Sequence, residues 1–265
     1  MIETTQTWKI GNCLELLPEI ESDSINMILS DLPYGTSGNK WDFIIPIKPL
    51  FDQYRRIIKD NGVIVLTSAQ PFTSMLIMEN LDIFKYNLIW DKQSSGGGFL
   101  NAKNRPLSTY EDIIIFSKGG CTTGSKIPMV YNPQMVKSKE KYIMKPNKYA
   151  NNTKEPKLKH LKKRDTIETS SYYRYPKSVI TILNHHHQKD KVHPTQKPVK
   201  LFKYLIKTYT NEGDIVHDSC LGSGTTLEAC RFTNRNCIGF EISDEWEKYY
   251  PERILQHNKK LNEWI

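Results

Sequence analysis

The stretch from Ile25 to Gly35 places the strongest constraint on how this chain can fold. It begins as a mostly apolar run, Ile25 to Ser30, and ends abruptly in Asp31, Leu32, Pro33, Tyr34 and Gly35. A short apolar run bounded by turn residues is typical of a buried strand that enters a loop at its carboxyl end. In open α/β sheets ligands bind at the carboxyl ends of strands, so this loop is a candidate site. A surface turn, in which Asp31 and Gly35 serve only the turn geometry, is the alternative interpretation.

A second stretch, Asp218 to Thr226, ends another predicted strand in a glycine-rich turn. Gly222 and Gly224 carry no Cβ, so the backbone there can approach a ligand and present N–H groups to it. Glu241 ends the next predicted strand, at about the spacing where an acid accepts hydrogen bonds from ribose hydroxyls. A nicotinamide-binding fingerprint would require a third glycine where this chain has Leu227, so the pattern disfavours a dehydrogenase.

Together the two stretches resemble the amino-methyltransferases that methylate DNA on an exocyclic nitrogen. The catalytic tetrapeptide of that family is an acid or polar residue, Pro, Pro and an aromatic; here it reads Asp31 to Tyr34, with Leu32 in place of the first Pro. The cofactor loop of the family, Asp-Pro-Phe-x-Gly-x-Gly-Thr-Thr, here carries Ser219 and Cys220 in place of Pro and Phe. The catalytic stretch comes first and a variable region separates it from the cofactor loop, as in the β-type arrangement of the family.

The resemblance covers about residues 8–118 and 190–245, and it implies a Rossmann-like α/β fold that uses S-adenosylmethionine. The implied architecture is a mostly parallel seven-strand sheet with helices on both faces and an inserted basic target-recognition region. The implied catalytic residues are Asp31, Leu32, Pro33 and Tyr34. The residues implied to bind the cofactor are Asn12, Thr195, Lys197, Asp218, Cys220, Leu221, Gly222, Ser223, Gly224, Thr225, Thr226 and Glu241.

Three of these assignments, Thr195, Lys197 and Asn12, depend on smaller motifs. Residues 193–198 read His-Pro-Thr-Gln-Lys-Pro, and in the family the Thr and Lys of this motif line the methionine end of the cofactor. Asn12 follows Gly11 at a corner that lies near the cofactor's adenine in the family. A simple helix N-cap explains Asn12 equally well.

The residue types in the tetrapeptide suit methyl transfer to an amine. The lone pair of an exocyclic amine is delocalised into the base, so an enzyme must favour the pyramidal nitrogen with acceptors aimed at its N–H groups. Asp31 offers a carboxylate, and the backbone carbonyl of Leu32 offers a second acceptor. Tyr34 offers a ring on which a flipped-out base can stack. Methylation at carbon 5 of cytosine requires a Cys that follows a Pro in that family, and no Cys here follows a Pro.

The net charge of +8 is concentrated in one segment. Residues 118–191 contain 17 Lys and Arg against 5 Asp and Glu, so the rest of the chain is net acidic. A disordered, solvated charge run is one interpretation. Because the segment lies where the family has its target-recognition region, we expect it to contact DNA phosphates, with double-stranded DNA as the partner. The candidate DNA-binding residues are Lys162, Lys163, Arg164, Arg174 and Lys177.

The domain organisation predicted from these patterns has three parts. Residues 1–117 form the catalytic half of one methyltransferase domain, residues 118–191 the basic insert, and residues 192–265 the cofactor-binding half. The sequence contains no apolar run long enough to span a membrane. Its five cysteines include no C-x-x-C pair. We therefore expect a cytoplasmic protein of the bacterial or phage type. His185, His186 and His187 are consecutive and cannot all face one ion, so no metal site is expected.

The predicted activity is site-specific transfer of a methyl group from S-adenosylmethionine to N6 of adenine in DNA, as in restriction-modification systems. Adenine is favoured because an Asp at the head of the tetrapeptide usually accompanies adenine in the resembling family. An N4-cytosine methyltransferase and a catalytically inactive DNA-binding protein on the same fold are the alternatives. The sequence leaves open whether the protein is a monomer or a homodimer.

Overall fold

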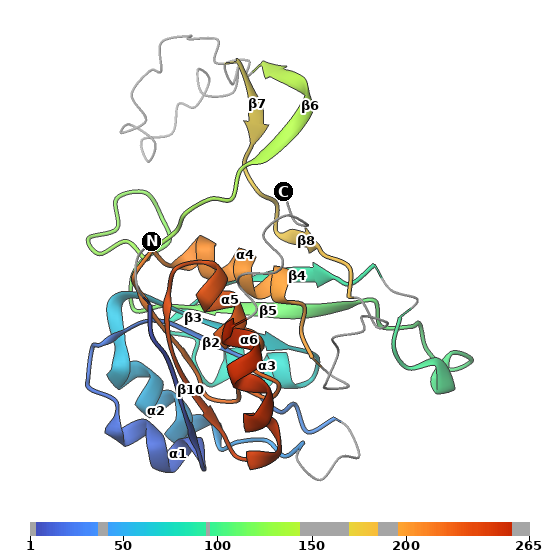
Figure 1. Cartoon of the computed structure of the whole chain (residues 1–265). Coiled ribbons are helices and arrows are strands. Elements are labelled where there is room, and N and C mark those ends of the chain that lie inside the picture. The colour runs from blue at the N-terminus through green and yellow to red at the C-terminus, as the bar shows by residue number, and fades with distance from the viewer. Residues whose placement is uncertain (1–3, 37–41, 94–95, 144–169, 185–195, 256–265) are drawn as a thin grey trace. The chain divides into compact units, whose positions relative to one another are not determined.

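The computed structural model describes residues 4–36, 42–93, 96–143, 170–184 and 196–255 (Figure 1). The chain divides into two compact units. The larger comprises Met1–Asn132 and Ser178–Ile265, and the smaller comprises Pro133–Lys177. The basic segment predicted at 118–191 is thus longer than the smaller unit, and its two ends belong to the larger one.

The larger unit alternates strands and helices along most of its length. Its strands are β1 (Gln6–Ile10), β2 (Ile25–Ser30), β3 (Ile58–Ser68), β4 (Phe84–Asp91), β5 (Tyr110–Phe116), β8 (Val179–Thr181), β9 (Ile215–Asp218) and β10 (Asn236–Glu241). Its α-helices are α1 (Cys13–Leu16), α2 (Ile47–Ile57), α3 (Phe72–Met78), α4 (Val199–Tyr209), α5 (Thr225–Phe232) and α6 (Tyr250–Leu255). Short 3₁₀ helices occupy Leu17–Glu19, Phe99–Asn101 and Asp244–Tyr249.

The strands of the larger unit form one sheet in the order β1-β10-β9-β2-β3-β5-β4-β8. Within it β5 runs antiparallel to both of its neighbours, and the other paired strands are parallel. The chain leaves β2 toward β3 on one side, while β9 leads to β10 on the other. The pair β2 and β9 is therefore the point where the strand order reverses, and such a point opens a ligand crevice at the carboxyl ends of the strands.

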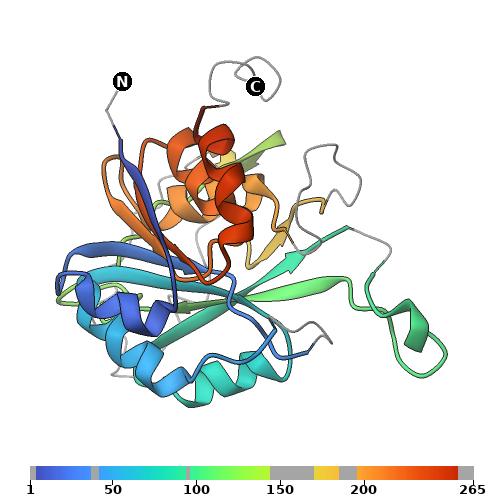
Figure 2. The ribbon, with the colours of Figure 1, turned by 60° about the horizontal axis from the view of Figure 1, so that its bottom comes forward.

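Alternation along the central strands explains why helices cover both faces of the sheet. Met27 and Leu29 of β2 point into one core cluster, where they pack with side chains of α4, α5 and α6. Ile28, between them, points into the other cluster, which contains side chains of α1, α2 and α3. Successive side chains of a strand point to opposite faces, so an apolar run of this kind is buried on both sides. Figure 2 shows the two layers of helices on either side of the strands.

The smaller unit contains a two-stranded antiparallel ribbon, β6 (Val136–Ile143) and β7 (Ser170–Arg174). Val136 pairs with Arg174 and Ile143 with Ser170. The side chains of Tyr172, Tyr173 and Tyr175 are exposed.

The sheet confirms the predicted α/β class and its mainly parallel character, but its described part has eight strands where seven were predicted. The additional strand, β8, has only three residues and pairs with Ile89–Asp91 at the edge of the sheet. A three-residue strand inside a basic segment gives no periodic signal, which is why the sequence did not reveal it. Within the described residues, no helix combines the length and apolar character that crossing a membrane requires.

One close approach couples the sheet to the glycine-rich loop. A Cβ built on Gly239 of β10 would overlap the side chain of Leu221, which is buried in that loop. We predict that Gly239→Ala lowers the free energy of unfolding by about 1–3 kcal/mol, as overpacking does in a filled core. Urea denaturation measures this change.

The double variant Gly239→Ala/Leu221→Ala is the control for this prediction. In the Leu221→Ala background the added methyl group has room, so Gly239→Ala should there change the free energy of unfolding by much less than in the wild type. Additive effects of the two substitutions would show that the overlap with Leu221 is not the cause.

Candidate functional site

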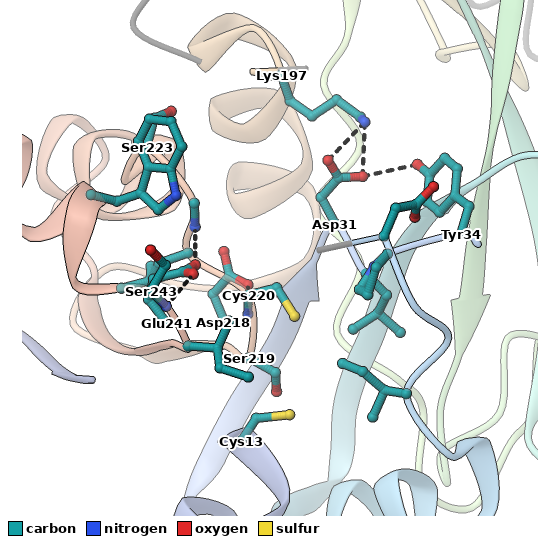
Figure 3. Close-up of a pocket in the computed structure, with 18 of the residues that line it drawn as sticks. Cys13, Asp31, Tyr34, Lys197, Asp218, Ser219, Cys220, Ser223, Glu241 and Ser243 are labelled. Atoms are coloured by element: carbon teal, nitrogen blue, oxygen red, sulfur yellow. Dashed lines mark hydrogen bonds and ion pairs between the residues drawn. The ribbon is translucent and has the colours of Figure 1, made fainter. Parts of the chain in front are cut away.

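A pocket of about 840 Å³ lies where β2 and β9 end, and both predicted loops line it (Figure 3). Asp31 follows β2 directly, and Asp218 is the last residue of β9. The two strands pair through Ile28 and His217, so the loops that follow them leave the sheet side by side. The topology therefore brings together two motifs that are almost 190 residues apart in the sequence.

Three donors fix the carboxylate of Asp31. The hydroxyl of Thr67 donates to Oδ1, and the hydroxyl of Tyr34 donates to the same oxygen at 2.9 Å. The Nζ of Lys197 lies 2.8 Å from both Oδ1 and Oδ2. The Asp31 side chain is still 26% exposed and lines the pocket, so this acceptor is both oriented and accessible.

Lys197 is the centre of a larger charge network. It also lies 3.2 Å from Oε2 of Glu111, and Nζ of Lys92 lies 3.3 Å from Oε1 of the same residue. Burial alone would lower the pKa of Lys197, but the carboxylates of Asp31 and Glu111 outweigh it and raise that pKa. The lysine is therefore a permanent cation next to Asp31.

Glu111 and Lys92 were missed in the sequence analysis. Glu111 is the second residue of β5, whose last four residues are buried and apolar. An acid at the end of such a strand requires a partner, and that requirement was the available signal. Lys92 directly follows β4, the neighbouring strand. Their contact could not be predicted without the order of the strands.

Tyr34 is held from two sides. Its ring stacks on that of Phe72, with centroids 5.7 Å apart and an interplanar angle of 28°. Its hydroxyl contacts Asp31 and lies 3.4 Å from Oε2 of Glu111. Burial and these two carboxylates raise the pKa of the Tyr34 hydroxyl well above its usual value, so it stays a hydrogen-bond donor.

The glycine-rich loop and Glu241 form the opposite wall of the pocket. Gly222 and Gly224 have φ of +50° and +82°, and Gly224 is the N-cap of α5. A Cβ on Gly224 would lie 2.8 Å from the ring of Tyr250, whereas one on Gly222 would meet open space. Glu241 accepts the N–H of Gly222 at 2.7 Å and the N–H of Ser243 at 3.0 Å. The loop therefore has a fixed shape with an open face at Gly222.

A chain of buried hydrogen bonds supports this loop from below. The hydroxyl of Tyr54 donates to Oγ of Ser219 at 2.8 Å, and Ser219 lies 2.9 Å from Nε2 of His217. Nδ1 of His217 lies 3.0 Å from the carbonyl of Ile238, so it carries the ring proton and Nε2 accepts from Ser219. Burial lowers the pKa of His217 to about 4. The backbone N–H of Ser219 also donates to Oγ of Ser30 at 2.9 Å, a bond that a Pro in this position could not make.

Asp218 is buried beside this chain. Burial raises its pKa to about 7, and the hydroxyl of Thr226 and the N–H of Cys220 both donate to its carboxyl group. Thr226 thus acts behind the pocket rather than on its surface. Asn12 caps α1, where its side chain accepts the N–H of Leu14 at 3.0 Å, and it also lines the pocket. The N-cap interpretation is therefore confirmed, and contact of Asn12 with a cofactor stays a prediction.

The pocket contains most of the candidate residues and several that were not predicted. The predicted residues that line it are Asn12, Asp31, Leu32, Pro33, Tyr34, Lys197, Asp218, Cys220, Leu221, Gly222, Ser223, Thr225 and Glu241. Unpredicted residues in its wall include Phe43, Ile45, Ile242, Ser243 and Trp246. Gly224 lies behind the wall, against α6.

Some candidate residues lie elsewhere. Arg174 and Lys177 are exposed residues of the smaller unit. Thr195, Lys162, Lys163, Arg164 and the histidines 185–187 lie outside the described residues. Among the described residues, no group of His, Cys, Asp or Glu side chains is arranged to hold a metal ion.

Comparison with known proteins identifies the family. A family model described as DNA methylase, of the N6/N4 methyltransferase type, matches residues 25–252. The chain belongs to this N6/N4 DNA methylase family. S-adenosylmethionine is the methyl donor of the family, so the predicted family and cofactor are confirmed.

Relatives of this methylase are named as type II methyltransferases or as a DNA adenine methyltransferase. The type II methyltransferase M.HpaI of Haemophilus parainfluenzae is 26% identical over 92% of this chain and 72% of its own length. The DNA adenine methyltransferase YhdJ of Escherichia coli K12 is 27% identical over 92% of this chain and 81% of its own length.

Solved structures share the fold of the methylase. The complex of M1.HpyAVI with S-adenosylmethionine has a TM-score of 0.61 and 21% identity, and the alignment covers 95% of this chain and 100% of that one. The cytosine-N4-specific PvuII DNA methyltransferase has a TM-score of 0.65 and 18% identity, with 96% and 89% covered. At these identities the likeness establishes the fold alone.

The two buried groups beside the glycine-rich loop predict opposing pH effects on the stability of the methylase. The folded protein favours protonated Asp218, so the stabilisation from this group is complete below about pH 4 and is lost as the pH rises to about 7. The folded protein favours neutral His217, so the stabilisation from this group is complete above about pH 6.5 and is lost as the pH falls to about 4. Between about pH 4 and pH 6.5 the two groups change the free energy of unfolding in opposite directions, so their contributions largely cancel.

Single substitutions should separate the two effects. From pH 7 to pH 4 the unfolding free energy of Asp218→Asn should fall relative to wild type, by up to ~1.4 kcal/mol per pH unit. That of His217→Gln should rise relative to wild type over the same range. Urea denaturation at half-unit pH steps measures both profiles, and the slopes are insensitive to any constant loss of stability. Profiles parallel to that of the wild type would contradict these assignments.

Proposed function

We propose that this methylase transfers a methyl group from S-adenosylmethionine to N6 of adenine in double-stranded DNA. The observation that carries the proposal is the Asp31 carboxylate, which Lys197, Thr67 and Tyr34 hold at the edge of the pocket. Asp31 heads the tetrapeptide, as is usual for adenine in this family. The name of the 27% identical relative from Escherichia coli, a DNA adenine methyltransferase, supports the same base.

The pocket residues fit the cofactor. A volume of about 840 Å³ lies within the range of pockets that enclose ligands of this size. Gly222 leaves open space toward the pocket, and Glu241 retains lone pairs that can accept ribose hydroxyls after its two backbone bonds. Ile242 and Trp246 provide an apolar wall next to Glu241 for a heterocyclic ring. Bound there, the cofactor supplies an electrophilic methyl group.

The residues on the other side of the pocket act on the target amine. In this proposal the carboxylate of Asp31 accepts one amine N–H, and the backbone carbonyl of Leu32, the next residue, accepts the second. Both bonds favour the nitrogen geometry in which the lone pair is available. Because the carbonyl provides the interaction, Leu32 can replace the Pro that the family usually has in this position. A bond to a carboxylate is charge-assisted and hence stronger than one to a hydroxyl.

The charged neighbours keep that carboxylate in place. Lys197 contacts both oxygens of the Asp31 carboxylate. Lys197 also forms an ion pair with Glu111, so it can stay protonated when Asp31 turns toward a substrate. Tyr34, supported by Phe72, presents an aromatic ring to a base that has left the duplex. These side chains orient the reacting groups and need not form a covalent bond to the substrate.

Recognition of the DNA is assigned to the basic segment 118–191. Arg174 and Lys177 are exposed on the smaller unit, close in sequence to the exposed Tyr172, Tyr173 and Tyr175. Cations that contact phosphates together with aromatic rings are a common combination in nucleic-acid interfaces. Lys162, Lys163 and Arg164 add a further cluster of positive charge in the same segment.

The Asp31→Asn variant tests the catalytic role. Because the substitution keeps the shape but removes the charged acceptor, we predict a fall in the methylation rate of at least ~100-fold. The dissociation constant for S-adenosylmethionine, measured by calorimetry, should change by less than about threefold, because Asp31 acts on the amine. Asp52→Asn, at an exposed position on α2, is the matched control and should retain full activity. Loss of cofactor binding with the rate at saturation intact would contradict the assignment.

Digestion of methylated DNA to nucleosides, followed by mass spectrometry, identifies the base. The proposal predicts N6-methyladenine. N4-methylcytosine without N6-methyladenine would overturn the adenine assignment and leave the role of Asp31 intact. DNA binding without any methylated nucleoside would favour the inactive DNA-binding protein.

A further inference from the structure

A loop between β4 and β5 projects from the larger unit, and residues 96–109 of it are here called the β4–β5 arm (Figure 2). Gly97 and Ser108 pair across the arm through backbone bonds of 2.8 and 3.0 Å. Beyond this pair the chain forms a 3₁₀ turn, Phe99–Asn101, that begins after Gly98 at a φ of +85°. The N–H of Arg105 then closes the tip on the carbonyl of Asn101 at 3.0 Å. The tip therefore has a defined backbone conformation.

Two apolar side chains occupy the tip of the arm. Phe99 is 80% exposed and Leu100 is 97% exposed, the highest values for large apolar residues in the described part of the chain. Burying one such side chain contributes about 1.5–3 kcal/mol, and the fold leaves both in water. Two adjacent exposed apolar residues on an ordered projection are typical of a surface that becomes buried in a complex.

The charge of the arm indicates the chemistry of its partner. Residues 96–109 contain Lys103 and Arg105 and no Asp or Glu. In the part of the chain that the structure describes, neither cation forms an ion pair. An apolar tip flanked by two free cations is complementary to a polyanion with an apolar interior, which is the chemistry of duplex DNA.

The arm begins and ends close in sequence to residues of the pocket. Lys92, which precedes the arm, and Glu111, which follows it, both line the pocket. Phe99 is seven residues from Lys92, so it lies within roughly 25 Å of it along the chain. DNA rises about 3.4 Å per base pair, so the tip can reach base pairs up to about seven positions away from a target base that lies in the pocket.

We propose that Phe99 and Leu100 enter the DNA duplex as an apolar wedge near the target base, while Lys103 and Arg105 contact phosphates. This inference rests on the proposed action on a base in duplex DNA. A base must leave the stack to reach a pocket of this kind, and the unstacked step exposes apolar surface. Phe and Leu are among the side chains that proteins insert between base steps. The wedge therefore stabilises the opened duplex.

The first test compares two double variants on duplex DNA cut from a fragment that the wild-type protein methylates. Phe99→Ser/Leu100→Ser removes the wedge without touching the core, and Met78→Ser/Leu81→Ser is the matched control, because those side chains are also exposed. We expect the wedge variant to lose at least tenfold in methylation rate and the control to lose less than twofold. Affinity for S-adenosylmethionine, measured by calorimetry, should be the same in all three proteins.

The second test locates the wedge. An abasic site placed successively at each position within seven base pairs of the target provides an already unstacked step. At one or two adjacent positions it should restore the rate of the wedge variant to within about threefold of wild type. A uniform lack of rescue, or a wedge variant as fast as the control, would overturn the proposal. Reduced cofactor affinity in the wedge variant would also overturn it, since the arm would then act through the fold.

The third test separates the wedge from the cations and does not require methylation. The slope of log affinity for duplex DNA against log salt should decrease by up to ~1.8 in Lys103→Ala/Arg105→Ala, and it should stay unchanged in the wedge variant, which binds more weakly at every salt concentration. Wild-type affinity in the wedge variant would contradict the inference. If the wild-type protein methylates no DNA, the proposed function fails, and these binding measurements still decide whether the arm contacts DNA.

Discussion

The contact between Lys197 and Asp31 is the interaction on which the site depends. A buried ammonium group is strongly unfavourable unless carboxylates surround it, and here Asp31 and Glu111 do so at 2.8 and 3.2 Å. Asp31 follows β2, and Glu111 lies at the start of β5. Lys197 directly precedes the N-cap residue of α4. Their charges therefore connect segments that lie far apart in the sequence, and the same contact orients the proposed acceptor of the reaction.

The features that could be predicted from the sequence are those encoded locally. The apolar run before Asp31 and the glycine-rich turn after Asp218 each depend on neighbouring residues. They supported the family resemblance, which implied the fold class and part of the pocket wall. Glu111 and Lys92 could not be assigned, because their roles arise from the order β3-β5-β4, which brings separate strand ends together. The short strand β8 could not be predicted for a different reason, because three residues are too few to show a hydrophobic periodicity.

The departures from the family motif have physical substitutes in this chain. Ser219 replaces a Pro that would restrict the loop, and it uses its backbone N–H to bond Ser30 and its hydroxyl to join Tyr54 and His217. A fully paired buried network of this kind can rigidify a loop as a Pro ring does. Leu32 keeps the backbone carbonyl that the proposed chemistry requires. The motif is thus altered in sequence but retains groups that can perform the same tasks.

The rate and cofactor affinity of Lys197→Met test the central claim most directly. The family resemblance implies that Lys197 binds the cofactor, whereas its contacts in the structure are with Asp31 and Glu111. If Lys197 acts through Asp31, the single-turnover methylation rate at saturating S-adenosylmethionine should fall by at least ~100-fold, with the cofactor dissociation constant within about threefold of wild type. Lys48→Met, at an exposed position on α2, should change neither quantity. A large loss of cofactor affinity with an unchanged rate at saturation would contradict the account.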